Sequence, residues 1–269
     1  MLRHHLSRKC IQVTNLILVL IFSFPMALAA VYAYLAYEAE DVASLWIYGY
    51  DIYNKNYRAA VHFICSYTYF ANCAGFPCHV TLSVCLLVHN YGYILIRMKK
   101  HLSTVHITDA TVMHSRILED YSIMEEKFRV LQDSLSFPLF LLLLICFLNL
   151  FTVLSAGLQL DIAAHHMVEL CSCTVTGTAI LFTLAYFCCK ISDQAMEMKV
   201  TVGSFIDKHQ FSYFKGVKDV FLLYRVEKKD VIYLSACGII NFKRNFLPSV
   251  VGTLFTYGLL ISNLKVKRD

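Results

Sequence analysis

Few clusters in this 269-residue chain combine the residue types and spacing that chemistry requires. His165, His166 and Glu169 are close in sequence, and His165 and Glu169 are about one helical turn apart, so they could share a metal ion. A zinc site needs a third protein ligand, and no HExxH or paired CxxC motif supplies it. The GxSxG, Walker A and Rossmann glycine patterns are missing too. We therefore predict no enzyme, no metal site and no cofactor.

Aromatic side chains form a second group with possible function, since the chain has 17 tyrosines and 19 phenylalanines. One interpretation is an aromatic belt at the membrane interface. The other is an aromatic pocket for a small organic ligand. For that pocket, polar and aromatic residues inside a predicted span are the candidates, because such residues usually face protein or a cavity. They are Tyr67, Tyr69, Asn72 and His79.

Residues 252–265, GTLFTYGLLISNLK, keep polar groups within an apolar helical run. In lipid, Thr256 can hydrogen-bond to its own helix, whereas Tyr257 and Asn263 need a polar neighbour or water. Leu260 and Asn263 are three residues apart and share a helix face. A leucine constriction beside an amide is an element with which channels gate and select ions. Ordinary packing of membrane helices uses polar groups as well.

The elements that must position these residues are membrane helices. The chain is 58% hydrophobic and only 16% charged, which is too apolar for a soluble globular protein. Five stretches without charge are each long enough for a helix to cross a hydrocarbon core of about 30 Å. We predict an all-α integral membrane protein with spans at about 11–37, 60–95, 136–160, 168–190 and 245–264. Gly75-Phe76-Pro77 is expected to kink the second span.

Residues 1–30 also have the basic start, apolar run and small-residue stretch of a secretory signal peptide. The apolar run continues to Leu35, and this favours a retained span.

Most of the 24 lysine and arginine residues fall in the N-terminal stub and in segments 97–135 and 190–244. The positive-inside rule places these segments in the cytoplasm and the C-terminus outside. Segment 105–135 is predicted to form an amphipathic cytoplasmic helix, because apolar residues from Ile117 to Leu135 recur on one face. Residues 217–225 have the same character, and the apolar stretch 231–238 is too short to span, so we expect it to be buried among cytoplasmic helices.

Residues 256–264, TYGLLISNL, resemble the Thr-Tyr, four hydrophobics, x, Gln-Phe signature that ends the last transmembrane helix of arthropod gustatory receptors. The upstream ACGIINFKR at 236–244 and Gly252 also fit the C-terminal pattern of that family, which is part of the insect chemoreceptor superfamily. Asn263-Leu264 replaces Gln-Phe, Gly258 stands where a hydrophobic residue is usual, and Pro248 is unexpected early in the last helix. The related insect odorant co-receptor ends in a similar segment with Gln-Leu-Lys.

The resemblance implies a seven-span plasma-membrane receptor with a cytoplasmic N-terminus and an extracellular C-terminus. Members assemble as tetrameric ligand-gated cation channels, with the last helix lining the pore and cytoplasmic helices anchoring the subunits. The five spans here would be the third to seventh, so the first two are expected to be lacking. The implied pore and gate residues are Thr256, Tyr257, Leu260 and Asn263, and the implied subunit-anchor residues are Tyr121, Phe128, Ala236, Cys237 and Gly238.

The expected function is therefore a gustatory receptor, a non-selective cation channel opened by a small organic tastant. Its expected partners are that ligand, the lipid bilayer and related receptors in a homo- or hetero-tetramer, but no nucleic acid. The expected organisation is four spans with a cytoplasmic helix in 1–190, an anchor-like segment in 191–244, and the last helix with its tail in 245–269. Two alternatives stay open: a fragment of a metabotropic receptor of the seven-helix type, and a transporter or membrane scaffold without a gated pore.

Overall fold

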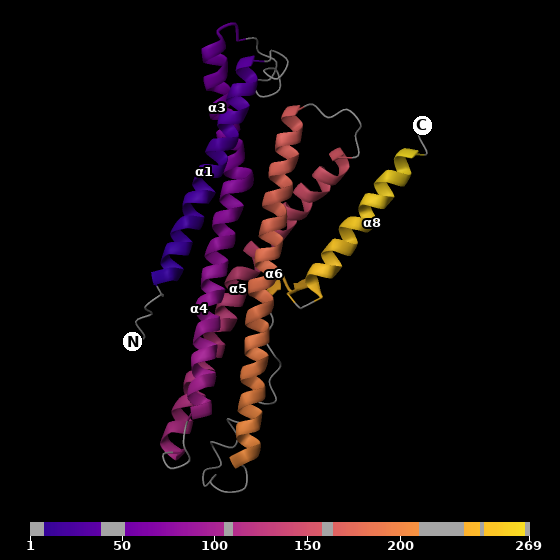
Figure 1. Ribbon diagram of the computed structural model, residues 1–269. Helices are drawn as coiled ribbons and strands as arrows, with labels where there is room; N and C mark the ends of the chain where they lie inside the picture. Colours follow the sequence, from indigo (N-terminus) through magenta and orange to yellow (C-terminus); the bar gives the residue numbers. More distant parts are fainter. Residues whose placement is uncertain are drawn as a thin grey trace. The chain divides into compact units, whose positions relative to one another are not determined.

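The protein folds into long helices, and the computed structural model describes residues 8–38, 52–104, 110–157, 164–209, 234–242 and 245–266. The helices are α1 (Arg8–Glu38), α3 (Lys55–Phe70), η1 (Ala71–Gly75), α4 (Phe76–Thr104), α5 (Ala110–Gly157), α6 (Ala164–His209) and α8 (Phe246–Val266) (Figure 1). Four described stretches are long and apolar enough to cross a membrane: Ile11–Glu38, Lys55–Lys100, Ser122–Gly157 and Met167–Thr201. Phe246–Leu260 of α8 is a shorter apolar helix. The predicted class, an all-α multi-pass membrane protein, is confirmed.

The chain forms two compact units, which are described separately. Unit 1 comprises Met1–Leu82, Cys146–Ile180 and Gly258–Asp269. Unit 2 comprises Ser83–Ile145 and Leu181–Tyr257. Helices α4, α5, α6 and α8 each contribute residues to both units.

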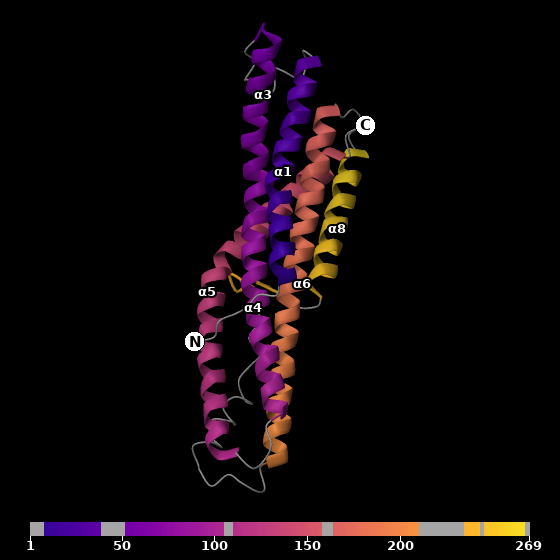
Figure 2. The ribbon, with the colours of Figure 1, turned by 60° about the vertical axis from the view of Figure 1, so that its left-hand side comes forward.

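In unit 1, helices α1 and α3 lie side by side (Figure 2). The buried residues of α1 recur every three or four positions, at Pro25, Ala29, Tyr32 and Ala36, and form one face. Its other faces are also apolar but exposed, as at Leu16 and Val19. A helix that is apolar all round and uncovered is suited to lipid rather than to water.

Helix α3 begins at a polar cap. The Asn54 side chain accepts hydrogen bonds from the backbone N–H groups of Asn56 and Tyr57, at 3.0 and 3.3 Å, which satisfies donors that have no partner within the helix. The buried residues of α3 are Arg58, His62, Ser66 and Phe70, spaced four apart. They give the helix one polar and aromatic buried face.

Helices α3 and α4 are joined without a break by the π-helical turn η1. The N–H of Phe76 donates to the carbonyl of Ala71, five residues earlier. Pro77 follows at once, and a proline removes a backbone donor and clashes with the carbonyl four residues before it. The wider turn therefore lies where the sequence predicted a kink.

Helices α5 and α6 have 48 and 46 residues, which corresponds to about 70 Å each. Each is longer than a bilayer crossing requires. Helix α5 joins the predicted cytoplasmic helix and the third span into one element, with Pro138 tolerated inside it. Helix α6 continues beyond the predicted end of the fourth span at residue 190.

Residues 234–242 form a small β-hairpin that the sequence analysis did not foresee. Strand β1 (Ser235–Ala236) pairs antiparallel with β2 (Ile240–Asn241), with Ser235 opposite Asn241. Cys237 and Gly238 have φ angles of 52° and 68°, and the N–H of Ile239 donates to the carbonyl of Ala236 at 3.0 Å. Two consecutive residues with positive φ angles, enclosed by a hydrogen bond between the residues on either side, define a tight hairpin turn.

Several predictions fall on residues outside this description. They are the amphipathic helix at 217–225, the loop at 39–51, the tail at 267–269, and the side chains of Tyr121, His165, His166 and Asn263.

Candidate functional site

Helix α8 carries the residues that the sequence assigns to a pore. Phe246 and Val250 are buried, whereas Val251, Phe255, Leu259 and Leu260 are all more than 40% exposed. Over the described residues 246–260, the chain covers a narrow stripe of this apolar helix, so most of that surface needs lipid or another subunit.

Thr256 and Tyr257 of α8 lie on its uncovered part. Thr256 Oγ1 donates to the carbonyl of Gly252 at 2.8 Å, which satisfies the hydroxyl within its own helix. Tyr257 and Leu260 are 51% and 53% exposed. Pro248 lies in the first turn of α8, where the backbone N–H of a residue has no partner within the helix, so the proline costs no hydrogen bond there.

Gly258 lets α8 approach α5 closely within unit 1. A Cβ atom at this position would come within 2.9 Å of Leu154 Cδ2, which is closer than van der Waals contact allows. Small residues allow membrane helices to approach each other closely. The departure from a hydrophobic residue at position 258 therefore has a packing reason in this chain.

The four candidate ligand-binding residues make separate contacts within the described part of the chain. Tyr69 reaches across to α6, where its hydroxyl donates to the Glu169 carboxylate. His79 packs against Phe22 of α1, with ring centroids 4.7 Å apart. Tyr67 stacks on Phe63 of its own helix, and Asn72 Nδ2 donates to the Thr68 carbonyl at 2.8 Å.

The contact of Tyr69 with Glu169 lies within a polar and aromatic cluster of unit 1. The Tyr32 ring lies 5.4 Å from that of Phe70, and the Tyr69 ring lies 5.2 Å from the same phenylalanine. Tyr32 also lies near Glu169 and the Cys173 thiol. Helices α1, α3 and α6 thus bring two phenols, a phenyl ring and a carboxylate together. Such a set can hydrogen-bond the polar group of a small molecule while aromatic rings contact its apolar part.

Tyr32, Phe70 and Glu169 belong to this cluster but are not among the four ligand-binding candidates of the sequence analysis. The sequence analysis considered Glu169 only as a metal ligand. A signal for Glu169 did exist, because it is the charged residue that immediately precedes the uncharged stretch Leu170–Cys189. Among the residues that the structure describes, no group of three or more His, Cys, Asp or Glu side chains could hold a metal ion.

The hairpin that contains Ala236, Cys237 and Gly238 packs on α5 in unit 2. The N–H of Cys237 donates to Ser136 Oγ at 2.8 Å, and Gln132 Nε2 donates to Ser235 Oγ at 3.3 Å. Leu234 and Ala236 are fully buried, whereas Cys237 and Gly238 are exposed.

Phe128, another predicted anchor residue, is only 8% exposed, and its ring lies 5.9 Å from that of Tyr91 on α4. The chain itself therefore covers Phe128 and Ala236. Cys237 and Gly238 are the predicted anchor residues that the described part of the chain leaves exposed.

No protein-family model and no curated protein matches this sequence. The structure is similar to that of the insect olfactory receptor OR5 from Machilis hrabei, with a TM-score of 0.61 and 13% sequence identity. The similarity covers 93% of this chain and 67% of that chain. At this level of identity, the comparison demonstrates a shared fold.

Proposed function

We propose that the protein is a chemosensory receptor, and more specifically a gustatory receptor that works as a ligand-gated, non-selective cation channel. The observation that carries the proposal is the last helix. Helix α8 bears the Thr256-Tyr257 motif and leaves most of its apolar surface uncovered by its own chain. The fold shared with an insect olfactory receptor supports the same assignment.

The ligand would bind at the cluster of Tyr32, Tyr69, Phe70 and Glu169. A small organic molecule with a hydroxyl or amino group would compete with Tyr69 for the Glu169 carboxylate. Because this carboxylate belongs to α6 and Tyr69 belongs to α3, such competition would change how the two helices are held together.

A chain of close contacts in unit 1 would pass this change to α8. Gly177 of α6 faces Leu150 of α5, since a Cβ atom at position 177 would lie 3.3 Å from Leu150 Cγ. One turn further along α5, Leu154 packs against Gly258 of α8. Contacts of this kind transmit a shift only if the elements have two arrangements, which here are the closed and open positions of α8.

In the proposed assembly, four copies of α8 surround the pore, Leu260 closes it and Asn263 faces the permeating cation. Replacing Leu260 with alanine would remove the constriction and raise the current without ligand. Leu259→Ala is the matched control, because Leu259 directly precedes Leu260 and is 65% exposed, compared with 53% for Leu260.

The first experiment is a mass determination of the purified protein in detergent, followed by current recordings against a panel of tastants with G-protein signalling blocked. A tetramer with ligand-evoked currents, and a basal current that rises in Leu260→Ala but not in Leu259→Ala, is the expected result. A monomer, or currents that vanish when G-protein signalling is blocked, would contradict the proposal. Unchanged basal and ligand-evoked currents in a Leu260→Ala tetramer would contradict the gate assignment alone.

A further inference from the structure

A small groove lies between α4 and α6 in unit 2. Among its lining residues, the Gly92 backbone meets the Gln194 side chain so closely that a Cβ atom at position 92 would come within 2.3 Å of Gln194 Oε1. On the same seam, the His89 and Phe187 rings meet edge to face, with centroids 6.3 Å apart. A side chain at position 92 would therefore displace the Gln194 amide from its present place in the groove.

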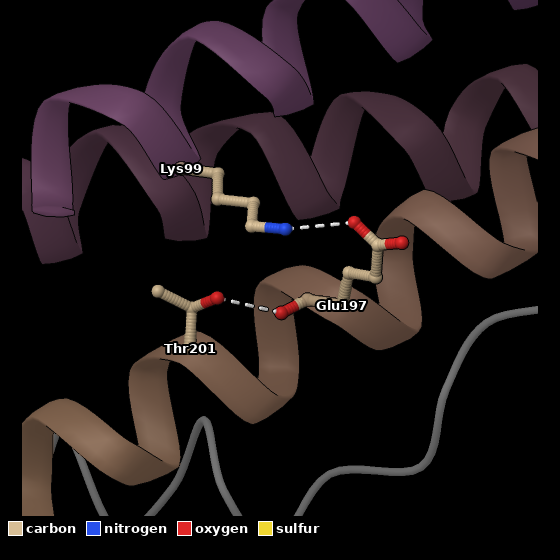
Figure 3. A network of polar contacts seen from close by, with 3 residues as sticks. All are labelled: Lys99, Glu197 and Thr201. Atoms are coloured by element: carbon tan, nitrogen blue, oxygen red, sulfur yellow. Dashed lines mark hydrogen bonds and ion pairs between the residues drawn. The ribbon is translucent and has the colours of Figure 1, made fainter.

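The two helices run in the same direction along this groove. Three pairs of contacting residues show this, because the numbers increase together on both helices: His89 with Phe187, Gly92 with Gln194, and Lys99 with Glu197. The last pair is an ion pair of 2.7 Å, and Thr201 donates to the Glu197 carbonyl beside it (Figure 3).

The groove offers cationic and donor groups and no acidic side chain. Lys190, His89 and Gln194 are among its lining residues. The Lys190 Nζ atom lies 5.4 Å from the centroid of the Tyr186 ring and 3.5 Å from the Tyr186 hydroxyl. Among the described residues, no carboxylate lies within ion-pair distance of Lys190. The charge of the groove therefore suits an anion.

The position of the groove along the helices matches the edge of a hydrocarbon core. The uncharged stretch of α6 ends at Cys189, directly before Lys190, and that of α4 ends at Ile96, directly before Arg97. Tyr93 and Ile96 at the rim are 53% and 49% exposed. An anion bound here would have its charge at headgroup depth and apolar surface beside it.

We propose that this groove binds the phosphate of an anionic phospholipid, with Lys190 as the main cation and the Gln194 amide and His89 ring as donors. The acyl chains would lie along the exposed Tyr93 and Ile96. The groove has a volume of about 60 Å³, which suits a phosphate, whereas sites for drug-sized ligands occupy roughly 300–1,000 Å³. The lipid site is separate from the proposed ligand cluster, and it does not depend on channel function.

The test is native mass spectrometry of the full chain in detergent, titrated with phosphatidylglycerol or with neutral phosphatidylcholine. The expected result is a preference for phosphatidylglycerol that falls about fivefold in Lys190→Gln and is retained in Lys190→Arg. Lys99→Gln is the matched control, since it removes the same charge from a residue that pairs with Glu197 outside the groove. Phosphatidylglycerol binding should persist in this control.

Three outcomes would overturn the proposal. They are equal binding of the two lipids, an equal loss in Lys99→Gln and Lys190→Gln, and complete displacement of the lipid by millimolar inorganic phosphate. The second would show general attraction by surface charge, and the third would show a site for free anions rather than for lipid. Circular dichroism of each variant shows that the comparison is made between folded proteins.

Discussion

Tyr69 and Glu169 are 100 residues apart in sequence, yet their side chains meet in unit 1. A carboxylate among apolar helices is costly unless it accepts hydrogen bonds, so the Tyr69 hydroxyl has a structural role in addition to the recognition role that we propose for it. Tyr67, two residues away, directs its ring along its own helix onto Phe63, and its hydroxyl has no hydrogen-bond partner among the described residues.

The two tyrosines therefore form a matched test. Tyr69→Phe removes the hydroxyl that donates a hydrogen bond to the Glu169 carboxylate, and we expect it to destabilise the protein by about 1–3 kcal/mol. Tyr67→Phe should change stability by less than about 0.5 kcal/mol. Thermal unfolding in detergent measures both, and equal effects of the two substitutions would mean that the contact with Glu169 contributes nothing.

The sequence identifies which residues of a span are polar, but not which neighbour each of them meets. Tyr67, Tyr69, Asn72 and His79 are equivalent by composition, and yet only Tyr69 and His79 reach another helix in a described contact. The partner is set by how α1, α3 and α6 pack together. That packing depends on residues far apart in the chain, and it cannot be predicted from a single sequence.

At the scale of elements, the helices could be predicted because each must cross an apolar medium without exposing its backbone. The hairpin at residues 234–242 could not. Its strands have two residues each, too few for a period-two pattern, and its turn uses Cys237 at a positive φ that non-glycine residues rarely adopt. Tertiary contacts with α5 hold it instead.

Ser136 provides a direct test of this docking. In Ser136→Ala the Cys237 N–H loses its acceptor, so we expect faster hydrogen–deuterium exchange around Cys237 and a loss of about 1–2 kcal/mol in stability. Ser134→Ala is the control, because the Ser134 hydroxyl bonds only to the Val130 carbonyl of its own helix. Exchange that is unchanged in Ser136→Ala would contradict the contact.

Helix α8 has two glycines that differ in their surroundings. A side chain at Gly258 would meet Leu154, whereas no atom lies within 4 Å of a Cβ at Gly252. We expect Gly258→Leu to separate α8 from α5 and to cost about 1–3 kcal/mol through overpacking. Gly252→Leu should be tolerated.

Adding Leu154→Ala to Gly258→Leu should recover part of the lost stability, because it removes the side chain that the new leucine meets. Chemical denaturation of these three variants and of the unsubstituted protein in micelles measures these differences. Equal losses in Gly252→Leu and Gly258→Leu would show that the approach of α8 to α5 is not tight.

At the scale of the whole molecule, the parallel course of α4 and α6 is informative about topology. Two helices separated by a single span must cross the membrane in the same direction, and the seam of unit 2 has this arrangement. The direction in which these helices cross the membrane is predicted by the positive-inside rule, which places the N-terminus in the cytoplasm and the C-terminus outside the cell.

Epitope tags would test that orientation. We expect a tag after Asp269 to be stained on intact cells, and a tag before Met1 to be stained only after the cells are permeabilised. The reverse pattern would invert the assignment of the cytoplasmic and outer faces, and with it the leaflet of the proposed lipid groove.

The π-helical turn η1 has a consequence for how this molecule tolerates changes of length. It closes a hydrogen bond over five residues instead of four, so it contains, in effect, one inserted residue. Deleting a residue from 71–75 would remove that extra residue and restore a regular helix, so the segment before it would keep its phase relative to α4. The buried face of α3, from Arg58 to Phe70, would then still face α1. The same deletion elsewhere in α3 or α4 would rotate the preceding segment by about 100°, so this turn is the place in the continuous helix that accepts a change of length.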